Sequence, residues 1–335
     1  MDGIGWGPGD ADRNPFARAE LPHLAVLLGR RPVAWRDGSA ADAGWGALAL
    51  DASMGVAGTP QSGTGQGALI TGRNVARLVG GHSGPFPTAA VQSILASDSL
   101  WRDAVRRGQA AALATAYPAR IIDRVAGGGG RLSSIARAAV QAGIPLRGSA
   151  DAAAGAAVPP FLGPSARAMH GRPVVADPFA AGRALAAVAA ANVVTVYEHF
   201  ATDVAGHRRD MGAAVDALER LDALIGGILS RWPERDVLVL MSDHGNLEDL
   251  STHHHTDAPA IGAWRAGGGR AAGGCARRGA GDSRGTRLVG AGAQASALMP
   301  DRRQRAIAPG RTPWEDGGAD AIPGYGVVPP GAPAG

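Results

Sequence analysis

The chain has 335 residues, of which 45% are hydrophobic and 19% charged, and a formal net charge of +4. No apolar run reaches the ~18 residues of a membrane-spanning helix, and the N-terminus lacks the pattern of a secretory signal, so we expect a cytoplasmic protein without a membrane partner. Cys275 is the only cysteine, which excludes an intrachain disulfide. Ten of the 33 basic residues, all arginine, lie in residues 261–312. The rest of the chain is net acidic, so we expect no nucleic-acid partner.

The hydrophobic pattern predicts alternating strands and helices. In chain order we first expect a strand at 46–50, a segment at 62–66 that leads into a helix through 68–70, and helices at 98–125 and 132–142. A loop-rich stretch or small subdomain follows at 148–175. We then expect a helix at 180–191, a strand at 192–197, a helix at 208–231 and a strand at 237–241. Strand, helix, strand in this order forms a βαβ unit. The sequence therefore predicts an α/β fold with a mostly parallel sheet flanked by helices.

Carboxylates and imidazoles follow two of the predicted strands. Asp203 and His207 lie four residues apart after one strand, and Asp243 and His244 directly follow the next. His255 lies eleven residues after His244. Ligands collect at the carboxyl ends of parallel strands, and this mixture of side chains suits zinc or manganese. Two such clusters suggest a two-metal site, and such sites mostly act on phosphate esters. Read singly, these residues also fit a solvated helix start and a surface turn.

Three further candidates lie in the first part of the chain. Ser62 precedes a predicted helix, so it is either a nucleophile beside a metal or a simple helix N-cap, with Thr64 as the fallback hydroxyl. Asp51 ends a predicted strand and could contact substrate or hold a turn. Arg73 follows the helix and could bind phosphate or lie on the surface.

Four pieces of the sequence carry a resemblance to a known family. They are Asp2-Gly3-Ile4-Gly5, Gln61-Ser62-Gly63-Thr64-Gly65-Gln66, Thr202-Asp203 through His207, and Ser242-Asp243-His244-Gly245-Asn246 with His255-Thr256. In this order they resemble motifs of the alkaline phosphatase superfamily of metalloenzymes. The closest branch resembles cofactor-independent phosphoglycerate mutase and phosphopentomutase. The resemblance covers residues 1–260.

The resemblance implies a cofactor of two divalent metal ions, manganese or zinc. Asp203, His207 and His255 would hold one ion. Asp2, Asp243 and His244 would hold the other, with Ser62 as the nucleophile beside it. The implied fold is a doubly wound sheet with an inserted cap. Residues 1–99 and 181–260 would form the core, and residues 100–180 would form a cap much smaller than that of phosphoglycerate mutase.

The chain departs from the family pattern at three places. It starts at Asp2 without the apolar strand that the family has before this residue. Gln66 stands where the family usually has histidine. Residues 261–335 are rich in glycine and arginine, and lack the strand and helix that close the family's fold. We therefore expect this tail to be disordered or translated out of frame.

These residues predict an enzyme that transfers phosphoryl groups with divalent metals. Its substrate would be a small phosphorylated metabolite, a phosphate monoester, and Ser62 would carry a phosphoserine intermediate. The sequence leaves open whether the enzyme is a mutase or a phosphatase. One alternative is a hydrolase of a phosphodiester, sulfate ester or phosphonate, and another is a truncated, non-catalytic remnant.

Overall fold

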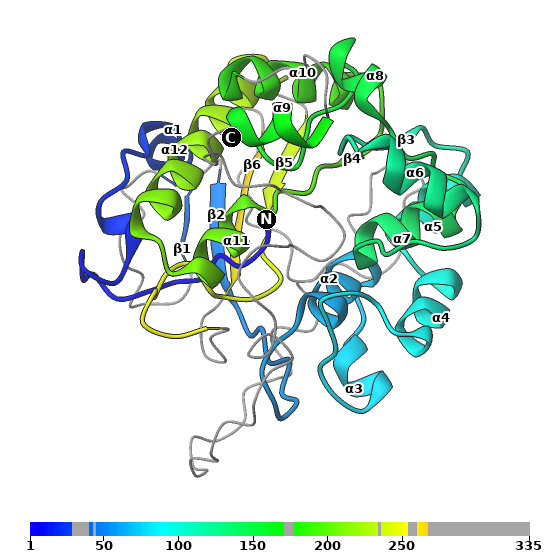
Figure 1. The fold of residues 1–335 in the computed structure, drawn as a ribbon, viewed down its shortest axis with the longest axis horizontal. Coiled ribbons are helices and arrows are strands. Elements are labelled where there is room, and N and C mark those ends of the chain that lie inside the picture. Colours follow the sequence, from blue (N-terminus) through cyan, green and yellow to red (C-terminus); the bar gives the residue numbers. More distant parts are fainter. Residues whose placement is uncertain (29–39, 43–44, 171–176, 234–235, 254–259, 267–335) are drawn as a thin grey trace, which may run out of the picture.

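The structure, a computed structural model, describes residues 1–28, 40–42, 45–170, 177–233, 236–253 and 260–266. This part is an α/β fold with strands near the centre and helices around them (Figure 1), as predicted. Within the described ranges, no helix combines the length and the apolar character needed to cross a membrane.

The strands form two sheets. The larger sheet has the order β1-β2-β6-β5, with bounds β1 (Ala40–Asp42), β2 (Trp45–Leu50), β6 (Ala260–Ala266) and β5 (Val237–Leu240). Its three pairings are antiparallel. The smaller sheet pairs β3 (Ala111–Leu113) with β4 (Val194–Val196) in parallel.

The prediction of a mostly parallel sheet is wrong for these described strands. The chain does run from β4 through helices to β5, but β5 pairs with β6 and not with β4. Strand β6 lies between β2 and β5 and runs antiparallel to both of them. Strand β6 begins at Ala260, the last residue of the predicted core, and extends to Ala266, which lies in the expected tail. Residues 267–335 lie outside the described ranges, so the nature of the tail stays a prediction.

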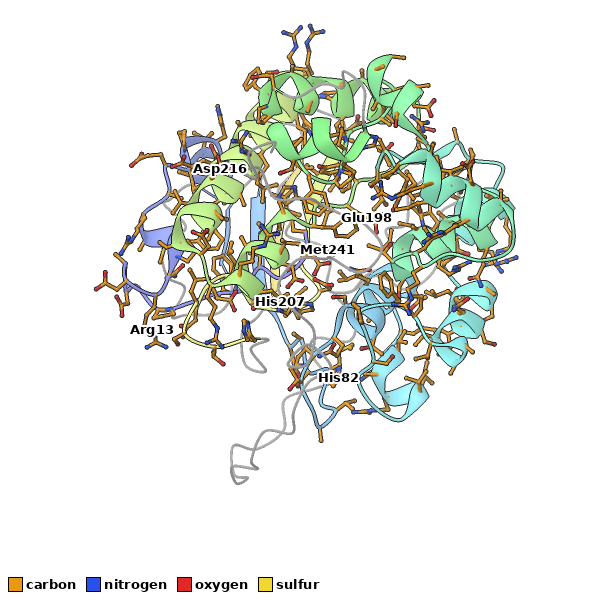
Figure 2. The ribbon with its side chains drawn as sticks, in the orientation of Figure 1. Arg13, His82, Glu198, His207, Asp216 and Met241 are labelled. Atoms are coloured by element: carbon orange, nitrogen blue, oxygen red, sulfur yellow. The ribbon has the colours of Figure 1, made fainter. Side chains whose placement is uncertain are left out.

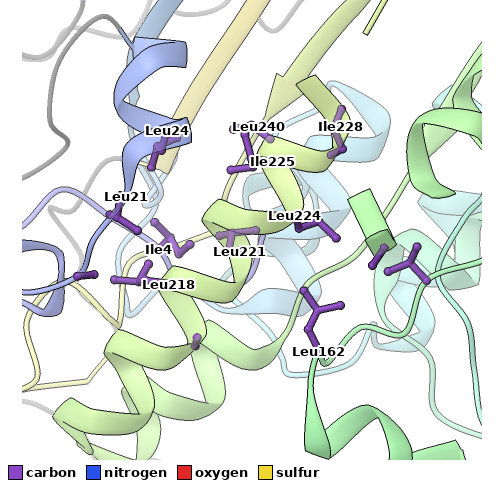
Figure 3. Close-up of a cluster of buried hydrophobic side chains, with 14 of the residues drawn as sticks. Ile4, Leu21, Leu24, Leu162, Leu218, Leu221, Leu224, Ile225, Ile228 and Leu240 are labelled. Atoms are coloured by element: carbon purple, nitrogen blue, oxygen red, sulfur yellow. The ribbon is translucent and has the colours of Figure 1, made fainter. Parts of the chain in front are cut away.

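The longest helix organises the first hydrophobic core. Helix α12 (Met211–Leu229) begins after Asp210, whose side chain accepts a hydrogen bond from the Ala213 N–H. The leucines and isoleucines of its buried face contact the N-terminal segment, α1 (Pro22–Leu28) and the end of β5 (Figure 3). Helix α10 (Pro178–Ala190) packs closely on α12, because Gly182 has no side chain: a Cβ there would lie 2.0 Å from the Leu224 carbonyl oxygen. This core supports the helix that precedes β5.

A second hydrophobic core lies among the helices on the right of Figure 1. Those helices are α2 (Ser62–Thr71), α3 (Val75–Val79), α4 (Ala89–Ser97), α5 (Leu100–Arg106), α6 (Ala119–Ala126) and α7 (Ser134–Gln141). Two short helices follow, α8 (Ser149–Ala153) and α9 (Pro164–His170). Because β3 lies in the expected cap but pairs with β4, the cap region shares a sheet with the core. The domain boundaries stay a prediction.

The prediction of a single helix at 98–125 is wrong. The structure has α5, then β3, then α6 in this stretch. Gly108 follows α5 with a φ of +62°, a conformation that ends a helix readily only at glycine. The apolar run that follows forms β3 instead of continuing the helix. The helix expected at 132–142 is confirmed as α7, with Ser133 as its N-cap.

The first residues of the chain lie between the ends of β4 and β5. The amino group of Met1 donates to the Met241 carbonyl at 2.8 Å, just past β5. The Asp2 N–H donates to the His199 carbonyl at 3.0 Å, past β4. Asp2 therefore lies where the two sheets approach each other. The absence of a family strand before Asp2 stays a prediction.

Candidate metal centre

Three buried side chains from distant parts of the sequence form one cluster. Ligand atoms of Asp2, Asp243 and His244 all lie within 4.8 Å of one another. Nε2 of His244 is 3.5 Å from Oδ1 of Asp2 and 3.8 Å from Oδ2 of Asp243. Donors about 2.0–2.1 Å from a tetrahedral zinc ion are about 3.4 Å apart. The spacing of the three donors therefore fits a divalent cation.

The loop after β5 is held in shape by two buried polar side chains. The Ser242 hydroxyl accepts from the Ile4 N–H at 2.9 Å and donates to the His244 carbonyl at 3.0 Å. A carboxylate oxygen of Glu248 accepts from the N–H groups of Gly5, at 2.7 Å, and Asn246, at 3.0 Å. These contacts fix Asp243 and His244 relative to the N-terminal segment that carries Asp2.

Helix α2 brings Ser62 and Gln66 to the cluster. The Ser62 hydroxyl oxygen lies 3.0 Å from Nε2 of His244. The reading of Ser62 as the N-cap is wrong, because Gln61 occupies that position and Ser62 is the first helical residue. One turn later, Nε2 of Gln66 donates to Oδ2 of Asp2 and to Oδ2 of Asp243, each at 3.2 Å. One amide thus holds the two carboxylates together.

The electrostatics of the cluster favour a bound cation. Burial, followed by the charges of Asp243 and Asp203, raises the pKa of Asp2 well above its usual value. Burial alone lowers the pKa of His244, but the charges of Asp243 and Asp203 outweigh it and raise the pKa. Oδ1 of Asp2 and Oε1 of Gln66 are buried without a hydrogen-bond partner among the described residues. A divalent cation would offset the charge of the carboxylates and satisfy Oδ1, so the donor set fits a metal.

A second pair of candidate ligands lies next to the first cluster. Nε2 of His207 is 3.4 Å from Oδ2 of Asp203, and both residues lie on α11 (Ala201–Arg208; Figure 2 labels His207). The Asn246 amide donates to Oδ1 of Asp203 at 2.8 Å. Gly3 allows this approach: its φ is +65°, and a Cβ there would lie 2.5 Å from Oδ1 of Asp203. The rings of His207 and His253 are 5.4 Å apart. The expected third ligand, His255, lies outside the described residues.

Within the described ranges, the two candidate substrate contacts, Asp51 and Arg73, make no hydrogen bond or ion pair with these clusters. Oδ1 of Asp51 accepts from the N–H and the hydroxyl of Ser53, and Oδ2 accepts from the Gly55 N–H, so Asp51 holds a turn. Arg73 follows the C-terminal end of α2, while Ser62 starts that helix. Ten residues of helix place them about 15 Å apart along the axis.

Sequence reasoning missed several residues that shape the site. Gln66 was noted only as a departure from the family's histidine, and Asn246 only as part of a motif, while Glu248 was assigned no role. Glu198 was not noticed at all. Its carboxylate is buried and accepts hydrogen bonds from the hydroxyls of Tyr117 and Ser133. A charged residue directly after a predicted strand was the only available signal for Glu198.

Comparisons with known proteins support the resemblance. Residues 178–261, which contain Asp203, His207, Asp243 and His244, match the family model described as the metalloenzyme superfamily. The phosphopentomutase of Helicobacter pylori (strain HPAG1) is 43% identical over 64 residues, which are 19% of this chain and 15% of that enzyme. The phosphopentomutase of strain Shi470 is 42% identical over the same length. The matched stretch thus spans 15% of the curated relatives.

One solved structure, the "Structure of PH0037 protein from Pyrococcus horikoshii", aligns with 80% of this chain and 84% of its own, at 14% identity and a TM-score of 0.45. The sequence matches confirm that the chain resembles metalloenzymes of the alkaline phosphatase superfamily, and phosphopentomutase among them.

Proposed function

We propose that this chain is a metal-dependent phosphoryl-transfer enzyme that acts on a small phosphate monoester through a phosphoserine at Ser62. One observation carries the proposal: the Ser62 hydroxyl lies 3.0 Å from Nε2 of His244, inside the buried Asp2, Asp243 and His244 cluster. A hydroxyl at this place has both a cation site and a helix N-terminus beside it. The similarity to phosphopentomutase supports the same class of reaction.

Two sets of residues would hold the metals. Asp2, Asp243 and His244 would hold one divalent ion, and Asp203, His207 and His255 would hold the second. When bound, divalent ions offset negative charge on the attacking and leaving oxygens and lower the pKa of a neighbouring hydroxyl. The described distances support the first set fully and the Asp203–His207 pair of the second set.

The chain's own residues would position the reacting groups. Ser62 is the first residue of the ten-residue helix α2, and helix N-termini favour phosphate. Oγ of Ser62 would form the bond to phosphorus while the bond from phosphorus to the alcohol oxygen breaks. Gln66, through its two hydrogen bonds, would keep Asp2 and Asp243 in the orientation that a cation needs.

A mutase would return the phosphoryl group to another hydroxyl of the same substrate, whereas a phosphatase would transfer it to water. The name of the relatives makes pentose phosphates the first substrates to test. The manganese-loaded chain should be incubated with a panel of sugar phosphates, a phosphodiester, a sulfate ester and a phosphonate. An isomeric sugar phosphate as product supports the mutase, and inorganic phosphate supports the phosphatase. Turnover of the sulfate ester or the phosphonate alone would overturn the proposal.

A further inference from the structure

A cavity of about 120 Å³ lies on another side of α11, away from Asp203 and His207. Its walls come from α11, from α12 and from the segment before and at the start of α9. The residues used below are Phe161, Leu162, His199, Arg208, Asp216 and Arg220. We call this cavity the α11–α12 pocket. A space of this size holds several water molecules or one small solute.

One polar side chain of this pocket, that of His199, has unused hydrogen-bonding groups. His199 is 2% exposed, and neither of its ring nitrogens has a partner among the described residues. A neutral imidazole carries one donor and one acceptor, and buried groups of this kind are usually paired. An occupant of the pocket that offers an oxygen acceptor would pair with the N–H of one ring nitrogen.

Two arginines give the pocket a positive charge. Arg208 ends α11 and is exposed, while Arg220 on α12 donates from Nε to Asp216 at 2.7 Å (Figure 2 labels Asp216). The guanidinium of Arg220 lies against Gly163, where a Cβ would be 2.0 Å from Nη1. With one carboxylate against two guanidinium groups, the pocket has a net charge of +1 and favours an anion.

The apolar walls limit the size of that anion. Phe161 and Leu162 are buried and line the pocket beside Val204 and Ala205 of α11. From these contacts we propose that the α11–α12 pocket binds a small tetrahedral oxyanion, such as phosphate. Its oxygens accept hydrogen bonds from Arg208, Arg220 and the N–H of one ring nitrogen of His199.

The pocket is connected to the metal centre by the main chain. The His199 carbonyl accepts the N–H of Asp2, and α11 carries Asp203 and His207 on a different face from Val204 and Arg208. An ion in the pocket would therefore contact His199, which binds Asp2 through the main chain, and helix α11, which carries Asp203 and His207. The proposal does not depend on the proposed phosphoryl transfer, because none of its ligand contacts involves Ser62, Asp243 or His244.

The test uses inorganic phosphate as the probe and the histidine ring signals of the zinc-loaded, isotope-labelled full chain as the readout in NMR. We expect phosphate to shift the signals of His199 in a saturable manner. The same shift should persist in Asp243→Asn, which alters the metal centre and leaves the pocket intact. Sulfate offers the same oxygen acceptors, so it should compete with phosphate and shift the same His199 signals.

Two variants that change the pocket charge in opposite directions test the arginines. The double variant Arg208→Gln, Arg220→Gln should weaken phosphate binding at least about tenfold, as expected when charge-assisted hydrogen bonds are lost. Asp216→Asn breaks the same ion pair but leaves both cations, so it should bind phosphate as tightly as the wild type or more tightly. If the double variant does not fold, Arg208→Gln alone, at an exposed position, takes its place. Unmoved His199 signals in the wild type, or shifts that vanish in Asp243→Asn, would overturn the proposal.

Discussion

The hydroxyl oxygen of Ser62 and Nε2 of His244 lie 3.0 Å apart, although 182 positions separate the two residues in the sequence. Helix α2 supplies the first residue and the loop after β5 supplies the second. The N-terminal segment then adds Asp2 to the same place, through main-chain hydrogen bonds past β4 and β5. Three segments that are distant in sequence thus build one buried polar cluster.

Replacing the proposed nucleophile should abolish phosphoryl transfer without unfolding the chain. Ser62→Ala removes one buried hydrogen bond, to Nε2 of His244, so it should cost about 1–3 kcal/mol of folding free energy and leave the chain folded. Turnover should fall at least about 10³-fold, because loss of a nucleophile typically costs that much or more. Single-turnover labelling with a ³²P-phosphate monoester should mark the wild type at Ser62 and leave the variant unlabelled.

Thr64→Ala is the matched control, since Thr64 is the other buried hydroxyl of the same helix turn and donates to the Gln61 carbonyl. This variant should keep the label. A label that disappears in Thr64→Ala and persists in Ser62→Ala would assign the nucleophile to Thr64 instead.

Removing the amide that joins the two carboxylates should make the metal-free chain less stable. Gln66→Met keeps the approximate shape of the side chain but deletes the donor to Asp2 and Asp243. Buried acceptors that lose their donor cost about 1–3 kcal/mol of folding free energy. Urea unfolding in EDTA should show this loss, and manganese should recover part of it by binding the same carboxylates.

The control for Gln66→Met is Gln92→Met. Gln92 donates to the Pro87 carbonyl and does not contact a carboxylate in the described structure. The loss of folding free energy in Gln92→Met should be the same with and without manganese. An equal response of both variants to manganese would contradict the role assigned to Gln66.

Adding a methyl group at Gly3 should disturb Asp203. Gly3→Ala places a Cβ 2.5 Å from Oδ1 of Asp203, at a φ of +65°. Gly72→Ala has nearly the same φ, +68°, but nothing within 4 Å of the new atom. The control should therefore show only the backbone cost of about 1–2 kcal/mol, whereas Gly3→Ala should lose more stability and also bind less metal. Equal stability and metal content in the two variants would show that Asp203 is not constrained by Gly3.

Asp51 should contribute to stability and not to substrate binding. Its carboxylate accepts hydrogen bonds from Ser53 and Gly55 within one exposed turn. Asp51→Ala should cost about 1 kcal/mol of unfolding free energy while KM stays unchanged. A several-fold rise in KM, with little change in stability, would restore Asp51 as a substrate contact.

The sequence singled out candidate ligands that lie close together in the structure, but it did not identify the side chains that hold them in place. Asp203, His207, Asp243 and His244 follow β4 and β5, and the ends of strands are recognisable from short apolar runs that stop at polar residues. Ser62 could be singled out because it precedes a predicted helix and lies in a piece that resembles the family's nucleophile loop. Gln66 could not, because its role depends on two carboxylates that come from other segments.

Strand pairing was the main feature that sequence reasoning could not predict. The period of apolar residues identifies a strand but not its neighbour, so β5 was assigned to β4 when its partner is β6. β6 itself was missed because it lies where the glycine- and arginine-rich composition begins. The expected helix at 98–125 failed for a related reason: the alanine-rich run around β3 is compatible with either a helix or a buried strand.

The most direct test of a metalloenzyme is the metal content of the purified full chain after manganese loading, determined by elemental analysis. The account predicts about two ions per chain in the wild type and about one in Asp243→Asn, since that variant alters only the first set of ligands. His255→Ala should also lose about one ion, from the second set. A folded wild-type chain that retains no metal after loading would contradict the account.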